Sequence, residues 1–174
     1  MKHLVALVVV VLSLVGSIGP AGAARDGDPA DVNGKLDIGL TRFVEPEKGI
    51  AQLTIVTYES WGCAHLGQGK QTTLRWLIDG RGDSDFDLVG TFYCRQKKLL
   101  FDLRSTDGAN RYEPIKVRRR GDSRTALVRF PMDLVELKGD ETSAVAKSND
   151  LSGETCIRPC YDRAPDTGRL RLSE

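Results

Sequence analysis

The stretch that decides the fold is residues 71–94, QTTLRWLIDGRGDSDFDLVGTFYC. Its arms, 71–79 and 86–94, alternate apolar and polar residues on either side of the turn-forming segment GRGDSD at 80–85. Alternation with period two around a Gly/Asp/Ser turn predicts an antiparallel hairpin that buries one face. The residues expected on the buried face are Leu74, Trp76, Ile78, Phe86, Leu88, Gly90, Phe92 and Cys94.

Short alternating runs also occur along the rest of the chain. They predict one helical turn within 131–137 and strands at 35–44, 50–61, 99–104, 115–119, 125–130 and 142–147. About eight short strands separated by polar turns indicate an all-β fold, a single antiparallel β-sandwich of immunoglobulin-like or jelly-roll-like type. The lack of strand–helix alternation argues against a Rossmann-like or barrel enzyme.

The first 24 residues have the pattern of a secretory signal peptide. A basic start at Lys2 precedes an apolar run over 4–15 and the small-residue site Ala21-Gly22-Ala23, with cleavage expected after Ala23 or Ala24. No second long apolar run follows. We therefore expect a secreted, extracellular protein without a membrane partner once the signal is removed. A flexible N-terminal arm at 25–34 would lead into a sandwich domain at 35–174.

Charge and length narrow the class of partner. Removal of Lys2 with the signal leaves 24 basic residues against 24 acidic ones. A neutral balance argues against nucleic acid or an anionic membrane as the main partner. The mature length suits one domain with a sizeable core.

Four cysteines remain after the signal. In an exported chain an even number predicts disulfides, and of the three pairings we favour Cys63–Cys94 and Cys156–Cys160, the second of which would pin the C-terminal tail. These cysteines with His65 also offer the atoms of a zinc site, but the C-x-H spacing is unusual and export favours oxidation.

Several short motifs carry a resemblance. They are DPADV at 28–32, LDI at 36–38, TYESW at 57–61, LRWLID at 74–79 and CIRPCYDRAPDTG at 156–168. In them the chain resembles a group of small secreted actinobacterial β-sandwich proteins without an assigned activity. Residues 74–87 are also distantly similar to sugar-binding or haem-binding sandwich domains. The resemblance implies an exported sandwich and brings no catalytic residue with it.

Four carboxylates crowd the central turn, at Asp79, Asp83, Asp85 and Asp87. Alternate acids can supply the oxygen ligands of calcium, the one cofactor that the sequence suggests. However, Arg81 and Leu88 stand where a calcium loop of the EF-hand type has an acid or amide and a glycine. Solvated turn acids are the interpretation we favour.

Aromatic residues are the other candidates for binding. Trp76 shares a face with apolar neighbours and belongs to the core, so Trp61 and Tyr58, at the end of a strand before a Gly-rich loop, are the candidate ligand-binding residues. His65 is the only histidine of the mature chain, and nothing beside it resembles a nucleophile elbow. We expect no enzymatic activity.

Arg-Gly-Asp-Ser occurs twice, at 81–84 and 120–123. The tripeptide Arg-Gly-Asp is an adhesion motif, but Gly, Asp and Ser are ordinary turn residues, and we interpret both copies as hairpin turns.

These features predict a secreted, non-catalytic binding or structural module. Its partner would be an extracellular protein or a polysaccharide. A carbohydrate- or cell-wall-binding domain is the alternative, followed by a secreted hydrolase.

Overall fold

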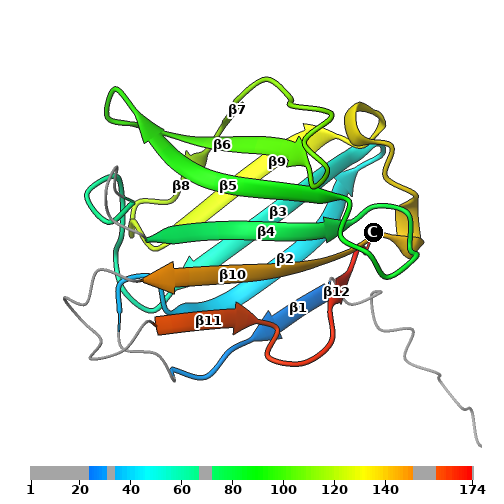
Figure 1. Ribbon diagram of the computed structural model, residues 1–174. Helices are drawn as coiled ribbons and strands as arrows, with labels where there is room; N and C mark the ends of the chain where they lie inside the picture. The colour runs from blue at the N-terminus through cyan, green and yellow to red at the C-terminus, as the bar shows by residue number, and fades with distance from the viewer. Residues whose placement is uncertain (1–23, 31–33, 67–71, 151–159, 174) are drawn as a thin grey trace, which may run out of the picture.

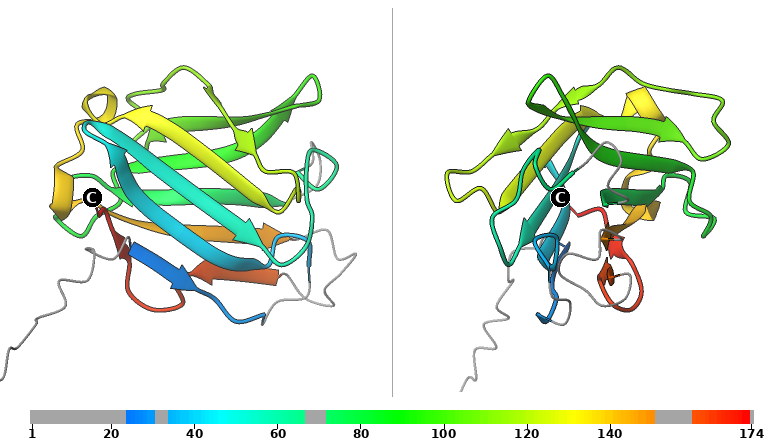
Figure 2. Two further views of the ribbon diagram at one scale, coloured as in Figure 1. Left: turned by 180° about the vertical axis from the view of Figure 1, so that it is seen from behind. Right: turned by 60° about the vertical axis from the view of Figure 1, so that its left-hand side comes forward.

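The computed structural model describes residues 24–30, 34–66, 72–150 and 160–173. They form two antiparallel sheets packed face to face, which confirms the single all-β sandwich (Figure 1). The first sheet has the order β1-β2-β3-β9-β8, and Figure 2 shows its β1, β2, β3 and β9 from behind. The second has the order β11-β10-β4-β5-β6-β7, with β12 also paired to β10.

The strands of the first sheet are β1 (Ala24–Gly27), β2 (Ile38–Glu47), β3 (Ile50–Thr57), β8 (Arg118–Arg119) and β9 (Thr125–Pro131). Those of the second are β4 (Thr73–Asp79), β5 (Leu88–Arg95), β6 (Lys98–Ser105), β7 (Ile115–Lys116), β10 (Ser143–Asp150), β11 (Cys160–Ala164) and β12 (Leu170–Arg171). The described residues thus hold more strands than the eight expected. The helical turn expected within 131–137 is the 3-10 turn Asp133–Val135, and a second one spans Gly139–Glu141.

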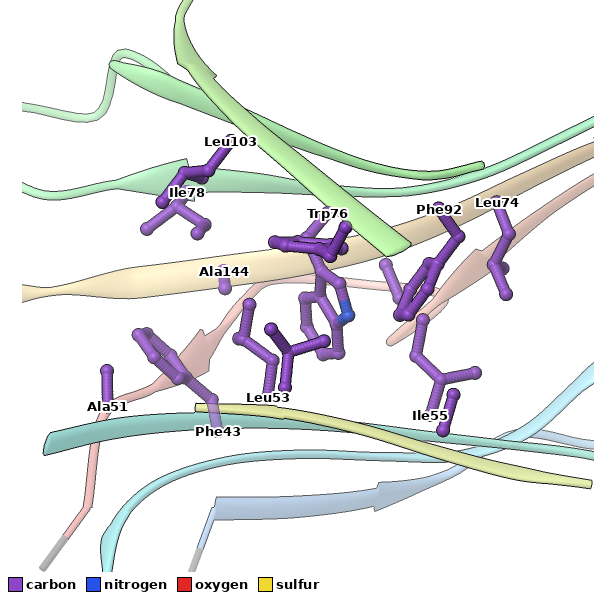
Figure 3. Close-up of a cluster of buried hydrophobic side chains, with 14 of the residues drawn as sticks. Phe43, Ala51, Leu53, Ile55, Leu74, Trp76, Ile78, Phe92, Leu103 and Ala144 are labelled. Carbon is purple, nitrogen blue, oxygen red and sulfur yellow. The ribbon is translucent and has the colours of Figure 1, made fainter. Parts of the chain in front are cut away.

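The central hairpin is confirmed as β4 and β5. Trp76 pairs with Gly90 across it, and Leu74, Trp76 and Ile78 are fully buried between the sheets (Figure 3). A side chain at Gly90 would meet the Phe101 ring 1.9 Å from its Cβ. The glycine is therefore needed because Phe101, itself fully buried, occupies the space beside it.

The segment expected as one strand at 115–119 is divided between the two sheets. Lys116 pairs with Leu100 of β6, whereas Arg118 pairs with Leu127 of β9. The chain therefore passes from one sheet to the other at Val117 and joins their edges at this side of the sandwich (Figure 1).

Strands form at both ends of the domain where the sequence predicted none. Residues 25–27 of the expected flexible arm belong to β1, and the Asp28 N–H donates to the Gly39 carbonyl over 3.2 Å. Residues after 147, where no strand was predicted and a disulfide-pinned tail was expected, contain the end of β10 and all of β11 and β12. The expectation failed because Asp162 of β11 is buried, where it accepts the Ile38 N–H over 2.6 Å, and a buried acid interrupts apolar alternation.

Two expectations lie partly or wholly outside the described residues. Removal of the signal peptide at 1–24 and the pair Cys156–Cys160 stay predictions. Among the residues that the structure describes, no helix is long and apolar enough to cross a membrane.

Candidate functional site

The acidic turn between β4 and β5 is braced by its own backbone. Asp79, only 2% exposed, accepts the Gly82 N–H over 2.7 Å and the Ser84 N–H over 3.0 Å. Arg169 donates to the same carboxylate over 2.9 Å, and its guanidinium covers the Phe86 ring at 4.1 Å. Asp79 therefore already has donors for both oxygens.

Asp87 has a similar set of partners. Its Oδ2 accepts the Gly80 N–H over 2.9 Å and the Arg81 N–H over 3.2 Å, and Arg81 forms an ion pair with Oδ1. That hydrogen bond to Asp87 raises the pKa of Arg81 above its ordinary value. Asp79, Asp83 and Asp87 bring carboxylate oxygens within 4.8 Å of one another, and Asp85 is outside this group. Calcium would have to displace arginines, so the geometry favours a braced turn over a metal site.

Both Arg-Gly-Asp-Ser copies form turns, as predicted, and they do so in the same way. Asp83 accepts the Asp85 N–H over 3.1 Å, and Asp122 accepts the Arg124 N–H over 3.0 Å. An aspartate that accepts from the residue two positions on is an Asx turn. The serines that end the motifs, Ser84 and Ser123, have left-handed φ angles of 76° and 54°.

Of the two candidate ligand-binding aromatic residues, Trp61 is buried, with only 3% of its surface exposed. Its indole Nε1–H donates to the Arg124 carbonyl over 3.0 Å, and its ring meets the Phe92 ring edge-on at 5.7 Å. This corrects the expectation that Trp61 is exposed for stacking. Tyr58 is 42% exposed, and its hydroxyl donates to the Asp28 carbonyl.

Cys63 and Cys94 form a disulfide, as predicted. The alternative of a zinc site that includes Cys63 is wrong because a disulfide sulfur is not a thiolate ligand. His65 lies beside this bond, where its Nδ1 accepts the Gly62 N–H over 3.0 Å.

A basic groove opens where the β7–β8 segment crosses between the sheets, and its volume is about 640 Å³. Four cations line it, and no Asp or Glu is among its described lining residues. The apolar lining consists of aliphatic side chains together with Trp61 and the disulfide. The residues lining this basic groove are Trp61, Gly62, Cys63, Lys97, Lys98, Leu99, Leu100, Lys116, Val117, Arg119 and Ser123.

Arg119 is the half-buried cation of the basic groove. Its guanidinium stacks on the Trp61 ring at 4.3 Å, and its Nη2 donates to the Trp61 carbonyl over 2.7 Å and to the Ser123 carbonyl. The Arg119 Nε is buried and has no hydrogen-bond acceptor among the described residues. No described carboxylate forms an ion pair with Arg119, and the nearby Asp122 is paired with Arg124. Burial lowers the pKa of Arg119, although the charge of nearby Asp122 opposes this shift.

Turn residues beside the groove have left-handed φ angles. Gln96 and Lys97, the two turn residues between β5 and β6, have φ angles of 52° and 63°, and Ser123 has 54°. Positive φ angles at both central residues are those of the type I′ turn that the twist of the strands favours in a two-residue hairpin, so Gln96 and Lys97 identify a tight turn.

The positive charge of the groove could not be recognised from the net charge of the chain. Residues 95–124 contain ten Lys and Arg against four Asp and Glu, although residues 25–174 as a whole contain 24 of each class. The local excess was the available signal, but its lysines and arginines lie on three separate segments that only the fold brings together.

Comparison with known proteins adds no relative. No protein-family model, no curated protein and no solved structure matches this chain. The resemblance to small secreted actinobacterial sandwich proteins therefore stays a prediction, and the function has to be argued from the groove itself.

Proposed function

We propose that this protein is an exported, non-catalytic binding module that holds an anionic ligand in the basic groove. The observation that carries the proposal is Arg119, a half-buried guanidinium with no carboxylate paired to it among the described residues. A partly desolvated charge that forms no ion pair, with Asp122 acting on it only from nearby, is costly, and a ligand anion would supply a direct partner.

The rest of the groove supports an anion in the same place. Lys97, Lys98 and Lys116 surround Arg119 without an opposing carboxylate in the lining. Like charges held together repel one another, so a bound anion lowers the energy of all four. The Cys63–Cys94 disulfide supports an exported location because such bonds persist in oxidising compartments.

The test is binding of a small sulfated sugar, the heparin-derived disaccharide, measured by calorimetry at low salt. Arg119→Gln should weaken binding about ten- to hundredfold, since a hydrogen bond to a charged group contributes about 1.5–3 kcal/mol. Arg75→Gln, an exposed arginine on β4, is the matched control and should leave affinity unchanged. Equal affinity in Arg119→Gln and the native protein, or no binding at any salt concentration, would contradict the proposal.

A further inference from the structure

A second hollow of about 320 Å³ lies beside the basic groove. Its lining residues are Ile115, Lys116, Arg118, Leu127 and Arg129. Lys116 lines both concavities, and residues of the 115–119 segment form walls of each. The groove and this second hollow are therefore neighbours along one crossing segment.

The second hollow repeats the chemistry of the first. Its lining combines three cations, Lys116, Arg118 and Arg129, with the aliphatic side chains of Ile115 and Leu127, and no carboxylate is among its described lining residues. The Arg129 Nε–H donates to the Gln52 amide oxygen over 2.7 Å, which orients this guanidinium. The two hollows together are lined by six cations and meet at Lys116, which lines both: Lys97, Lys98, Lys116, Arg118, Arg119 and Arg129.

We propose that the ligand is a linear acidic polysaccharide with carboxylate or sulfate groups on successive sugars, and that one chain occupies both hollows across Lys116. This inference rests on the proposed function. One small anion would leave the second set of cations unused, whereas a chain with repeated charges pairs with both. The aliphatic side chains in both linings can pack against the C–H faces of sugar rings.

Other polyanions fit these hollows less well. Single-stranded nucleic acid uses exposed aromatic faces for base stacking, but the aromatic residue in the lining, Trp61, is 3% exposed and covered by Arg119. An acidic peptide that adds a strand needs a longer edge than β7 and β8, which have two residues each. The large hydrophobic residues exposed among the described ones, Tyr58, Leu134 and Tyr161, line neither hollow, which disfavours a membrane surface.

The test compares heparin-derived disaccharide and octasaccharide with polyglutamate and oligothymidylate by calorimetry at fixed salt. The octasaccharide should bind at least about tenfold tighter than the disaccharide, because contacts in the second hollow become intramolecular. Arg118→Gln with Arg129→Gln should weaken octasaccharide binding about two- to thirtyfold, as expected for the loss of two exposed charge pairs, and leave the disaccharide unaffected. Arg119→Gln should weaken both sugars. Arg75→Gln with Arg171→Gln, two exposed arginines elsewhere, is the control.

The possible negative results distinguish the proposed function from the proposal of an extended chain. If neither sugar binds, the proposed function fails and this inference fails with it. If both sugars bind equally, or the double variant at Arg118 and Arg129 changes nothing, the extended chain is overturned while anion binding in the groove stands. Tighter binding of polyglutamate or oligothymidylate than of octasaccharide overturns the polysaccharide class. Thermal unfolding of each variant checks that the fold is retained.

Discussion

Asp79 is a buried charge and Arg119 is a half-buried one, and their surroundings differ. Asp79 receives two backbone N–H groups and the Arg169 guanidinium. Arg119 has two backbone carbonyls and no paired carboxylate among the described residues. A fully satisfied charge indicates a structural brace, whereas a desolvated and unpaired one indicates a place for a ligand.

Asp79→Asn should destabilise the fold by about 2–4 kcal/mol, because the replacement leaves Arg169 without its charge partner and sets an amide against the Ser84 N–H. The measurement is urea unfolding. Asp85→Asn is the control and should change stability by less than about 0.5 kcal/mol, since Asp85 is exposed. In the same assay, millimolar calcium should leave the native Tm unchanged. A rise in Tm with calcium would contradict the assignment of this turn as a brace.

The turn aspartates predict a dependence on acid. The Ser105 hydroxyl lowers the pKa of Asp107, and the Arg124 N–H lowers the pKa of Asp122, each below its ordinary value. Because the folded pKa is depressed, their contribution to stability is complete above the unfolded value of about 3.9 and is lost as pH falls through the folded value. Carboxyl carbon NMR titration should place both midpoints below 3.9. Ser105→Ala should return the pKa of Asp107 toward its ordinary value without moving that of Asp122.

At the scale of elements, the alternation of apolar and polar residues correctly predicted strands that bury one face. The β4–β5 hairpin was predicted correctly because Leu74, Trp76 and Ile78 all face one core. The alternation pattern did not predict β11, where Asp162 is buried. It also predicted one strand where the structure has two, β7 and β8. That division depends on which sheet edge lies nearest to each residue, which is a property of the assembled sandwich.

The disulfide ties the loop before β4 to the end of β5, and it closes a segment with a sequence separation of 31. Restricting the unfolded chain over such a loop contributes about 3–4 kcal/mol. Cys94→Ser should lower the free energy of unfolding by that amount, measured with guanidinium. Cys160→Ser is the comparison. If the predicted Cys156–Cys160 pair exists, its short loop contributes less, so a larger loss in Cys160→Ser would contradict this ranking.

At the scale of the whole molecule, residues 25–174 are neutral in sum, but an excess of positive charge lies within residues 95–124 and the compensating excess of negative charge lies elsewhere. The neutral balance argued against nucleic acid or an anionic membrane as the main partner, and it could not predict the groove. Lys97, Lys116 and Arg119 come from a hairpin turn and two short edge strands, so their proximity follows only from how the two sheets are joined.

The central claim is that an anion binds at Arg119. The most direct measurement follows the arginine Nε–H and backbone amide NMR signals of the native protein during titration with heparin-derived disaccharide. The account predicts that the Arg119 Nε–H signal moves together with the amides of Cys63, Lys98 and Lys116, while the signals of Arg81 and Arg169 stay in place. Shifts confined to residues 79–87, or none at saturating disaccharide, would contradict it.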